Sequence, residues 1–439
     1  MGTIWVGIDD TDSPQGGCTT WVLSELLALA REEGVDLIGE PRLVRLNPNI
    51  PWKTRGNAAL GAHFGRGEGP RREVGNVLGR PLLSYARGRP LPASEETPFL
   101  EHAWERVLER SRRGEPGTDP AIVAVRHRLP ARVYYRAVRE VVPVEEVRRF
   151  LESSNAFFRA EGDGRGLVGA SAAVAWPGRR ATWELIAYRP IGREGARRRV
   201  EAGSVRSTAR RHPRLFLCHD PATRRLLVTP HTPCPILFGL RATDRSSPLL
   251  ARADVISEPV DRWLLFRTNQ GTGDHLVSRT ARELVPFGSA RISGVVSGPP
   301  VVARGGHVRL ALTDRVGIPF EAVAFEPTKT LPRVAQRLAV GDRVTVWGSR
   351  DESAALKLEG LRVVSLANRW GPELAPECSA CGRPSRSLGT RRGFRCPGCG
   401  ARFPPESARR VRKDPGIGLG EYHPTPSARR HLAPLGPEP

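Results

Sequence analysis

The chain has 439 residues, 39% of them hydrophobic, so it can supply cores for several domains. No apolar run is long enough to span a membrane, and the first residues lack a secretion signal, so we expect a cytoplasmic protein with no membrane partner. The 68 basic and 46 acidic residues leave a net charge of +22, which favours a polyanion such as nucleic acid. A GC-rich genome would explain the preference for arginine over lysine, but not the excess.

The first residues read as a strand, a polar loop and a helix. An apolar run ends at Ile8, the loop Asp9-Asp10-Thr11-Asp12 follows, and apolar residues recur at helical spacing over 23–30. A further strand is expected over 42–46, ahead of a second polar loop. This mixture predicts an α+β or α/β domain over residues 1–130.

Residues 131–256 predict a second, smaller α+β domain. We expect a helix after Pro143, where apolar residues again follow helical spacing. Strands are expected over 166–175 and 181–188, because these short apolar runs are bounded by glycine and proline.

Residues 257–368 contain a series of short β patterns with a helical insertion near 334–338. The number and length of the strands are typical of an OB-fold barrel, although another small β-barrel would give the same pattern. OB-folds commonly hold single-stranded nucleic acid. The five expected strands are 290–296, 308–312, 320–325, 342–347 and 356–364.

Residues 369–405 contain two cysteine pairs, Cys378-x-x-Cys381 and Cys396-x-x-Cys399. Each pair forms a turn that aims two thiolates at one point, and two turns complete the tetrahedral shell of structural zinc. We therefore predict a zinc ribbon; four unligated cysteines or an iron–sulfur site are the alternatives. Cys234 lies near His231, but without a further ligand nearby we interpret that loop as stiffened by proline.

Residues 406–439 form a basic tail that is rich in arginine, proline and glycine. No packing pattern is visible in it. We expect the tail to be extended and to order on a partner if at all, with its arginine clusters either solvated or on phosphates.

The clearest catalytic candidates are Asp9, Asp10 and Asp12, which follow a strand, where α/β-type domains place ligand sites. Carboxylates this close repel one another unless a cation lies between them, and Mg²⁺ bridging to phosphates would meet that need. An aspartate-rich turn that caps a helix is the alternative interpretation.

Two polar stretches are candidates for contacts with phosphate. Backbone donors and hydroxyls at a helix start, and cations beside a glycine and an amide, both suit phosphate. Neither stretch has the spacing of a Walker loop, so an ATP site here is of another type. The candidate residues are Gly16, Gly17 and Thr20 in the first stretch, and Lys53, Arg55 and Asn57 in the second.

Several stretches, in order along nearly the whole chain, resemble one family, the archaeal agmatinylcytidine synthetases that modify the wobble cytidine of an isoleucine tRNA. The matching segments are Gly7–Ser13, Cys18–Thr20, Arg45–Pro51, Lys53–Asn57, Trp183–Arg189, Thr232–Pro235, Phe266–Thr272, Glu326–Lys329 and the cysteine pairs.

The resemblance implies a multi-domain α+β protein with a kinase-like catalytic domain, a ferredoxin-like domain, an OB-fold and a zinc ribbon. It implies ATP, agmatine and the isoleucine tRNA with the CAU anticodon as substrates. In the family ATP is cleaved to AMP, the cytidine C2 oxygen is phosphorylated, and agmatine displaces that phosphate to give agmatidine. By position Thr19 would be the autophosphorylated threonine, although the residues alone do not separate it from Thr20. Asp9, Asp10 and Asp12 would hold Mg²⁺.

Agmatine carries two positive ends, so its pocket should contain carboxylates. Asp163 and Glu184 are candidates at the interface that we expect between the first two domains. Asp163 stands where we expect the family to have asparagine. Glycine-rich stretches such as 162–166 are usually ordinary turns.

Two other interpretations are compatible with the composition. One is a non-catalytic OB-fold and zinc-ribbon protein that binds single-stranded nucleic acid, against which the acidic loop argues, because carboxylates repel a polyanion unless a metal is present. The other is a different ATP-dependent RNA ligase or kinase.

Overall fold

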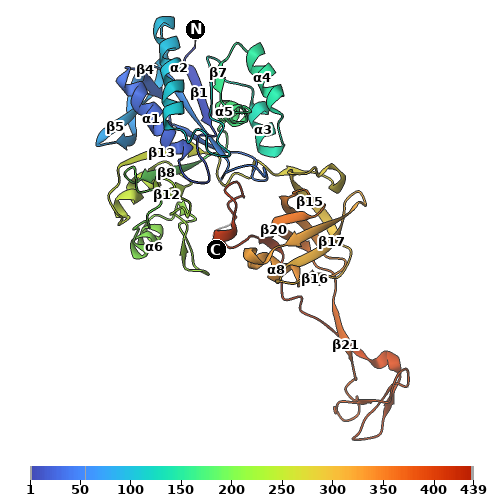
Figure 1. The fold of residues 1–439 in the computed structure, drawn as a ribbon. Helices are drawn as coiled ribbons and strands as arrows, with labels where there is room; N and C mark the ends of the chain where they lie inside the picture. The colour runs from blue at the N-terminus through green and yellow to red at the C-terminus, as the bar shows by residue number, and fades with distance from the viewer. Residues whose placement is uncertain (1, 55, 437–439) are drawn as a thin grey trace.

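The computed structural model describes residues 2–54 and 56–436. Figure 1 shows a large sheet with helices on both faces, a barrel below it, and a small module that an extended ribbon holds away from both. Within the described residues no helix is long and apolar enough to cross a membrane.

The large sheet contains eleven strands, and its main path is β7-β6-β1-β4-β3-β13-β8-β12-β9, with β2 and β5 paired beside β4. Its pairings are antiparallel except for β3 with β13 and β2 with β5. Strands from the beginning and from the end of residues 4–268 therefore belong to the same sheet. Their bounds are β1 Ile4–Asp9, β2 Asp36–Ile38, β3 Arg42–Arg45, β4 Ala58–Val77, β5 Arg80–Arg89, β6 Ala121–Val125, β7 Phe157–Ala160, β8 Thr182–Tyr188, β9 Leu215–Phe216, β12 Ile236–Ala242 and β13 Arg262–Thr268.

Helices cover both faces of this sheet. Helices α1 (Thr19–Glu32) and α2 (Ala93–Arg110) lie on one face, and α3 (Ala131–Arg139), α4 (Val144–Ser153) and α5 (Gly166–Ala175) lie on the other. Helices α6 (Ala202–Arg211) and α7 (Ser246–Ala251) follow beside β8 and β12.

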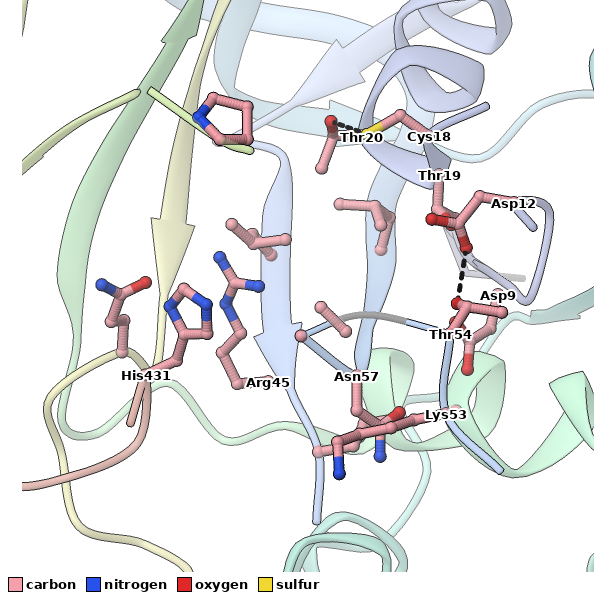
Figure 2. A pocket seen from close by; sticks show the side chains of 18 of the residues that line it. Asp9, Asp12, Cys18, Thr19, Thr20, Arg45, Lys53, Thr54, Asn57 and His431 are labelled. Carbon is pink, nitrogen blue, oxygen red and sulfur yellow. Dashed lines mark hydrogen bonds between the residues drawn. The ribbon is translucent and has the colours of Figure 1, made fainter. Parts of the chain in front are cut away.

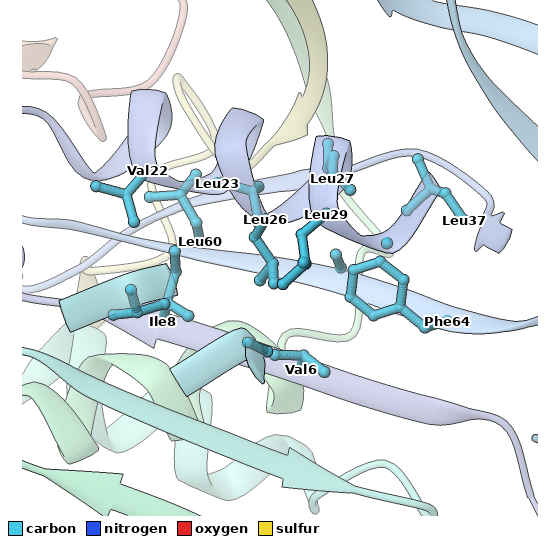
Figure 3. Close-up of a cluster of buried hydrophobic side chains, with 14 of the residues drawn as sticks. Val6, Ile8, Val22, Leu23, Leu26, Leu27, Leu29, Leu37, Leu60 and Phe64 are labelled. Atoms are coloured by element: carbon cyan, nitrogen blue, oxygen red, sulfur yellow. The ribbon is translucent and has the colours of Figure 1, made fainter. Parts of the chain in front are cut away.

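Helix α1 lies where the apolar spacing predicted it. Leu23 and Leu26 are buried against β1 and β4, where Ile8 and Phe64 face them (Figure 3). Burying such side chains stabilises the protein by about 1.5–3 kcal/mol each. This packing fixes the start of α1 next to the loop that carries the aspartates.

The strand that we expected over 166–175 is wrong, because this run forms helix α5. Nearly every residue of α5 is buried, so the run has no polar face, and a continuous apolar run does not distinguish a buried helix from a buried strand. Glycines let α5 approach β1 closely. A Cβ on Gly7 would lie 2.1 Å from the carbonyl oxygen of Ala170, and one on Gly169 would lie 1.7 Å from Asp9 Oδ2.

The five strands expected within 257–368 form a closed barrel, in which β15 pairs with both β19 and β17, and β18 and β20 complete the circuit. Residues 262–268, which the expected bounds place in the same domain, instead form β13 of the large sheet. The core of the barrel is aliphatic. The bounds are β15 Ser289–Val296, β17 Val308–Asp314, β18 Pro319–Ala324, β19 Arg343–Ser349 and β20 Leu356–Ser365, with α8 Thr330–Ala335 and the short strands β14 Val277–Ser278 and β16 Val301–Val302.

A two-stranded ribbon, β21 (Trp370–Leu374) with β25 (Arg409–Arg412), connects the barrel to the cysteine module. After it the chain returns to the barrel through β26 (Gly420–Tyr422), which pairs with β20. The module contains β22 Arg386–Ser387, β23 Phe394–Arg395 and β24 Arg402–Phe403, and a separate hairpin is formed by β10 His219–Asp220 and β11 Arg225–Leu226.

The basic tail is ordered within the protein itself, contrary to our expectation that it would order only on a partner. It contributes β25 and β26, and then residues 424–436 run back to the large sheet. Leu432 is 1% exposed. The tail lacks an apolar period because its few apolar side chains pack singly against surfaces built by other parts of the chain.

Candidate active site

A cavity of about 970 Å³ opens beside the end of β1. The loop after β1, the loop before β4, strands β8 and β12, and residues 426–431 all contribute to its wall. Figure 2 shows Asp9, Asp12 and Thr19 at one end, with Arg45 and His431 at the other. The cavity is therefore acidic at one end and basic at the other.

The three predicted aspartates all line this cavity. Asp10 has a φ of +59°, in the left-handed region that non-glycine residues seldom adopt and that is common at functional sites. Asp12 Oδ1 accepts a hydrogen bond from Thr54 Oγ1 at 3.3 Å, and its carbonyl oxygen accepts one from Thr118 at 3.0 Å. The loop is thus held by hydrogen bonds from two directions.

Burial and mutual repulsion make Asp9 and Asp10 reluctant to ionise. Burial, together with the charge of Asp12, raises the pKa of Asp9 to about 7. Burial and then the charges of Asp9, Asp119 and Asp12 raise the pKa of Asp10 to about 8. A nearby cation would relieve both effects.

These aspartates do not form a complete chelating set by themselves. Among the described residues, the four cysteines are the one group of at least three His, Cys, Asp or Glu side chains whose ligand atoms all lie within 4.8 Å of one another. Mg²⁺ usually takes one or two carboxylates and fills its shell with water and substrate phosphates, so the donor set fits that ion.

Thr19 and Thr20 both line the cavity and are buried, but they face different surroundings. Thr20 Oγ1 lies 3.0 Å from Cys18 Sγ, at hydrogen-bond distance for sulfur. In Figure 2 Thr19 lies at the acidic end of the cavity, where Asp9 and Asp12 also lie. The structure thus separates two residues that the sequence left equivalent.

Of the second predicted phosphate stretch, Lys53 and Asn57 line the cavity. Lys53 Nζ donates to the carbonyl oxygen of Pro48 at 2.7 Å, and Asn57 Nδ2 donates to that of Asn47 at 2.8 Å. Both side chains also brace the loop that carries them. Arg55 lies outside the described residues.

Gly16 and Gly17 lie in the same loop but are not among the residues that line the cavity. The backbone of Gly16 exchanges hydrogen bonds of 3.0 and 3.3 Å with Ser13. Gly17 has a φ of +77°, and a Cβ there would lie 2.7 Å from Arg112 Cγ. Their phosphate contacts stay a prediction.

The two agmatine candidates line the cavity, but each is already paired with arginine. Asp163 lies 2.5 Å from Arg165 Nη2, and this hydrogen-bonded pair lowers the pKa of Asp163 to about 2. Glu184 is 3% exposed and bonds Arg45 at 3.3 Å and Arg241 at 3.0 Å. Both carboxylates are therefore partly neutralised, and their role toward agmatine stays a prediction.

Sequence reasoning missed Asp119, His431 and Arg241. Asp119 precedes β6, and its neighbour across the turn is Gly162, where a Cβ would lie 1.8 Å from Asp119 Oδ1. The glycine-rich loop was a signal that could have been followed to this carboxylate. The sequence around His431 gave no signal, because no pattern in the tail shows that it returns to the large sheet.

The four cysteines of the module converge. Cys378 Sγ lies 3.4 Å from Cys399 Sγ, and Cys381 Sγ lies 3.4 Å from Cys396 Sγ. Backbone N–H groups, that of Cys399 first, lower the pKa of Cys396 to about 6. These distances are close to the sulfur–sulfur distance in a tetrahedral zinc–thiolate site, which is about 3.8 Å for Zn–S bonds of about 2.3 Å.

The loop with His231 and Cys234 takes partners within the protein. Arg225 Nε donates to His231 at 3.1 Å, and Arg198 Nη2 donates to Cys234 Sγ at 3.2 Å. That this loop binds no metal stays a prediction.

Two family models match this chain. The model described as the TiaS TCKD domain matches residues 5–161, and the model described as the TiaS FLD domain matches residues 164–275. The matches cover more than half of the chain and include every residue of the acidic end of the cavity. The first 275 residues thus carry the two domains found in TiaS proteins.

Curated relatives match along the whole length. The isoleucine-tRNA 2-agmatinylcytidine synthetase TiaS of Methanosarcina acetivorans is 34% identical over 99% of this chain and 97% of its own length. The enzyme of the same name from Archaeoglobus fulgidus is 34% identical over 98% of this chain and 96% of its own length. The chain belongs to the family of isoleucine-tRNA 2-agmatinylcytidine synthetases.

Solved structures agree with this assignment. Apo TiaS, an agmatidine synthetase for isoleucine tRNA, is 31% identical with a TM-score of 0.84, covering 98% of this chain and 96% of that chain. The complex of TiaS with isoleucine tRNA and ATP is 32% identical with a TM-score of 0.82, covering 99% and 96%. The complex of TiaS with the same tRNA, AMPCPP and agmatine is 30% identical with a TM-score of 0.80, again covering 99% and 96%.

The pKa values of Asp9 and Asp10 predict a pH-dependent stability. An unfolded aspartate ionises near pH of about 4, whereas the folded protein keeps these protons up to a pH of about 7 to 8. The folded state therefore binds more protons in that window, and the free energy of unfolding falls as the pH rises through it. In Asp10→Asn this fall should be smaller, which urea unfolding at pH 5.5 and 8.5 without added magnesium would measure. An equal fall in both proteins would contradict the assigned pKa of Asp10.

Proposed function

We propose that this protein attaches agmatine to C2 of the wobble cytidine of the CAU-anticodon isoleucine tRNA, using ATP and releasing AMP and phosphate. The observation that carries the proposal is the two-ended cavity, held within a fold that matches agmatinylcytidine synthetases along the whole chain. Relatives solved with isoleucine tRNA, ATP or its analogue, and agmatine support these partners.

The acidic end is the proposed site of phosphoryl transfer. A carbonyl oxygen of cytosine leaves only after it carries phosphate, and phosphoryl transfer depends on positioning and charge neutralisation. Asp9, Asp10 and Asp12 would hold Mg²⁺ there, which when bound supplies positive charge to the phosphate oxygens. Lys53 and Asn57 line the same cavity and would orient the polyphosphate.

The parts of the chain take the roles that the family suggests. Residues 5–161, matched by the first family model, form the proposed kinase-like domain. Residues 164–275, matched by the second model and including strand β13, form the proposed ferredoxin-like domain. The closed barrel is the proposed OB-fold and the cysteine module is the proposed zinc ribbon, both of which suit RNA. We expect this modification to take place in the cytoplasm.

The cationic ends of agmatine would meet carboxylates that already have arginine partners: Asp163 pairs with Arg165, and Asp119 Oδ2 also lies 3.9 Å from Arg165 Nε. Glu184 is buried between two arginines, whereas the side chain of Asp163 is 51% exposed. Asp163 is therefore the proposed partner of one end of agmatine, which it would share with Arg165.

The direct test is incubation of the protein with ATP, agmatine and unmodified isoleucine tRNA, followed by nucleoside mass spectrometry. We expect an agmatine adduct on the wobble cytidine. Asp9→Asn should lower turnover by at least about 100-fold with tRNA affinity unchanged, because transition-state charge then loses a partner. Phosphate addition or strand joining alone would identify a different RNA kinase or ligase, and tRNA binding without ATP consumption would identify a non-catalytic binder.

Thr19 is the proposed phosphate acceptor within the protein, because it lies at the acidic end while Thr20 bonds Cys18. Thr19→Val should take up no phosphate from ATP, and Thr20→Val should take up phosphate as the wild type does. Intact-protein mass spectrometry after incubation with ATP measures both. Phosphate on Thr19→Val at the wild-type level would refute the assignment.

The cysteine module should contain one zinc ion per chain, because its four sulfur atoms meet within 4.8 Å. Cys396→Ser should lose this zinc, whereas Cys218→Ser, which changes a buried cysteine outside the module, should keep it. Metal analysis by mass spectrometry distinguishes them. Zinc retained in Cys396→Ser at full stoichiometry would exclude the four-cysteine site.

A further inference from the structure

The C-terminal segment, residues 424–436, runs from the barrel back to the large sheet (Figure 1), and four of its residues line the cavity. The backbone N–H of Gly271 donates to the carbonyl oxygen of His431 at 2.8 Å, and that of Leu435 donates back to Gly271 at 3.1 Å. Leu432 packs into the core beneath α3 and α5. These bonds fix the position of the His431 ring in the cavity wall.

Glycines make room for this segment. Gly271 has a φ of +76°, and a Cβ there would lie 2.7 Å from Leu435 Cγ. A Cβ on Gly56 would lie 2.9 Å from Arg45 Nη1 and 3.2 Å from His431 Nε2. The arginine and the histidine, which are 386 positions apart, therefore meet over one glycine.

This end of the cavity contains more positive than negative charge. Arg45 and Arg241 share the single carboxylate of Glu184, at 3.3 and 3.0 Å. The side chains of the two arginines are 12% and 13% exposed. Arg45 Nε is buried and has no hydrogen-bond partner among the described residues. A buried N–H of this kind costs free energy unless a ligand accepts its hydrogen bond.

His431 adds a polar group to this end without adding charge. The positive charge of Arg45, then burial and the charge of Arg241, lower the pKa of His431 well below its usual value. A neutral imidazole keeps one N–H donor, which an anion can accept.

We propose that Arg45, Arg241 and His431 form a phosphate-binding subsite at the basic end of the cavity, and that the C-terminal segment completes it. Guanidinium groups bind phosphate oxygens through charge-assisted hydrogen bonds, and the unpartnered Arg45 Nε supplies one such donor. The excess positive charge disfavours doubly cationic agmatine here. The source of the phosphate rests on the proposed function: it is either the polyphosphate of ATP or a phosphodiester of the tRNA.

The test measures binding in the full-length protein without agmatine, by calorimetry with pyrophosphate, ATP and tRNA as separate probes. Arg45→Gln should lower the affinity for the affected probe by about 10- to 100-fold, the loss expected for a hydrogen bond to a charged group. His431→Ala should weaken it by about 2- to 10-fold, as expected for a neutral donor. Arg45→Lys keeps the charge and should recover part of the loss. The matched control is Arg126→Gln, because Arg126 pairs with Glu96 at 3.0 Å outside the cavity lining.

Two outcomes support the subsite and separate its sources. Weaker pyrophosphate and ATP binding with unchanged tRNA affinity identifies the nucleotide, and the reverse identifies the RNA backbone. Unchanged affinity for all three probes in folded Arg45→Gln and His431→Ala overturns the proposal. If Arg45→Gln does not fold, His431→Ala decides alone. Since binding and not turnover is measured, the subsite can fail while tRNA modification succeeds, and the reverse also holds.

Discussion

The close approach of helix α5 to strand β1 is the contact on which the candidate active site depends. Gly7 and Gly169 leave no Cβ between the two elements, so the helix backbone lies against the strand. The same approach covers the Asp9 carboxyl group at the end of β1. A larger side chain at either glycine would push the helix outward, and water would then reach Asp9. The burial that raises the pKa of this aspartate is thus a consequence of helix-to-sheet packing, and not of the acidic loop alone.

The cavity separates opposite charges that would otherwise neutralise each other. Glu184 holds Arg45 and Arg241 at one end, and the aspartates repel one another at the other. A reaction that joins a polyanion to a cationic amine needs an acidic and a basic environment close to the same nucleobase. A buried carboxylate restrains both arginine side chains, so the entropy lost in ordering them is lost on folding and not on ligand binding.

Much of this could be predicted from the sequence where signals are local. The apolar period of α1 and the five strands of the barrel depend on neighbouring residues, and these predictions are confirmed, as is the convergence of the four cysteines. The aspartate loop was a candidate because strand, loop and helix follow one another directly, whereas Thr19 was a candidate only through the family resemblance. Helix α5 was missed because complete burial removes the period that identifies a helix. Asp119 was missed because only the glycine-rich loop across the turn points to it, and His431 was missed because its place depends on long-range packing, which leaves no local pattern.

The ribbon of β21 and β25 has a topological consequence. Leu374 and Arg409 are paired neighbours, so the chain leaves for the cysteine module and comes back at almost the same point. The module is therefore an insertion at the tip of a hairpin, and its removal or exchange requires only a short turn to rejoin the strands. Natural selection could vary this distal part in size or sequence while the path from the barrel to His431 stays covalently continuous and in register.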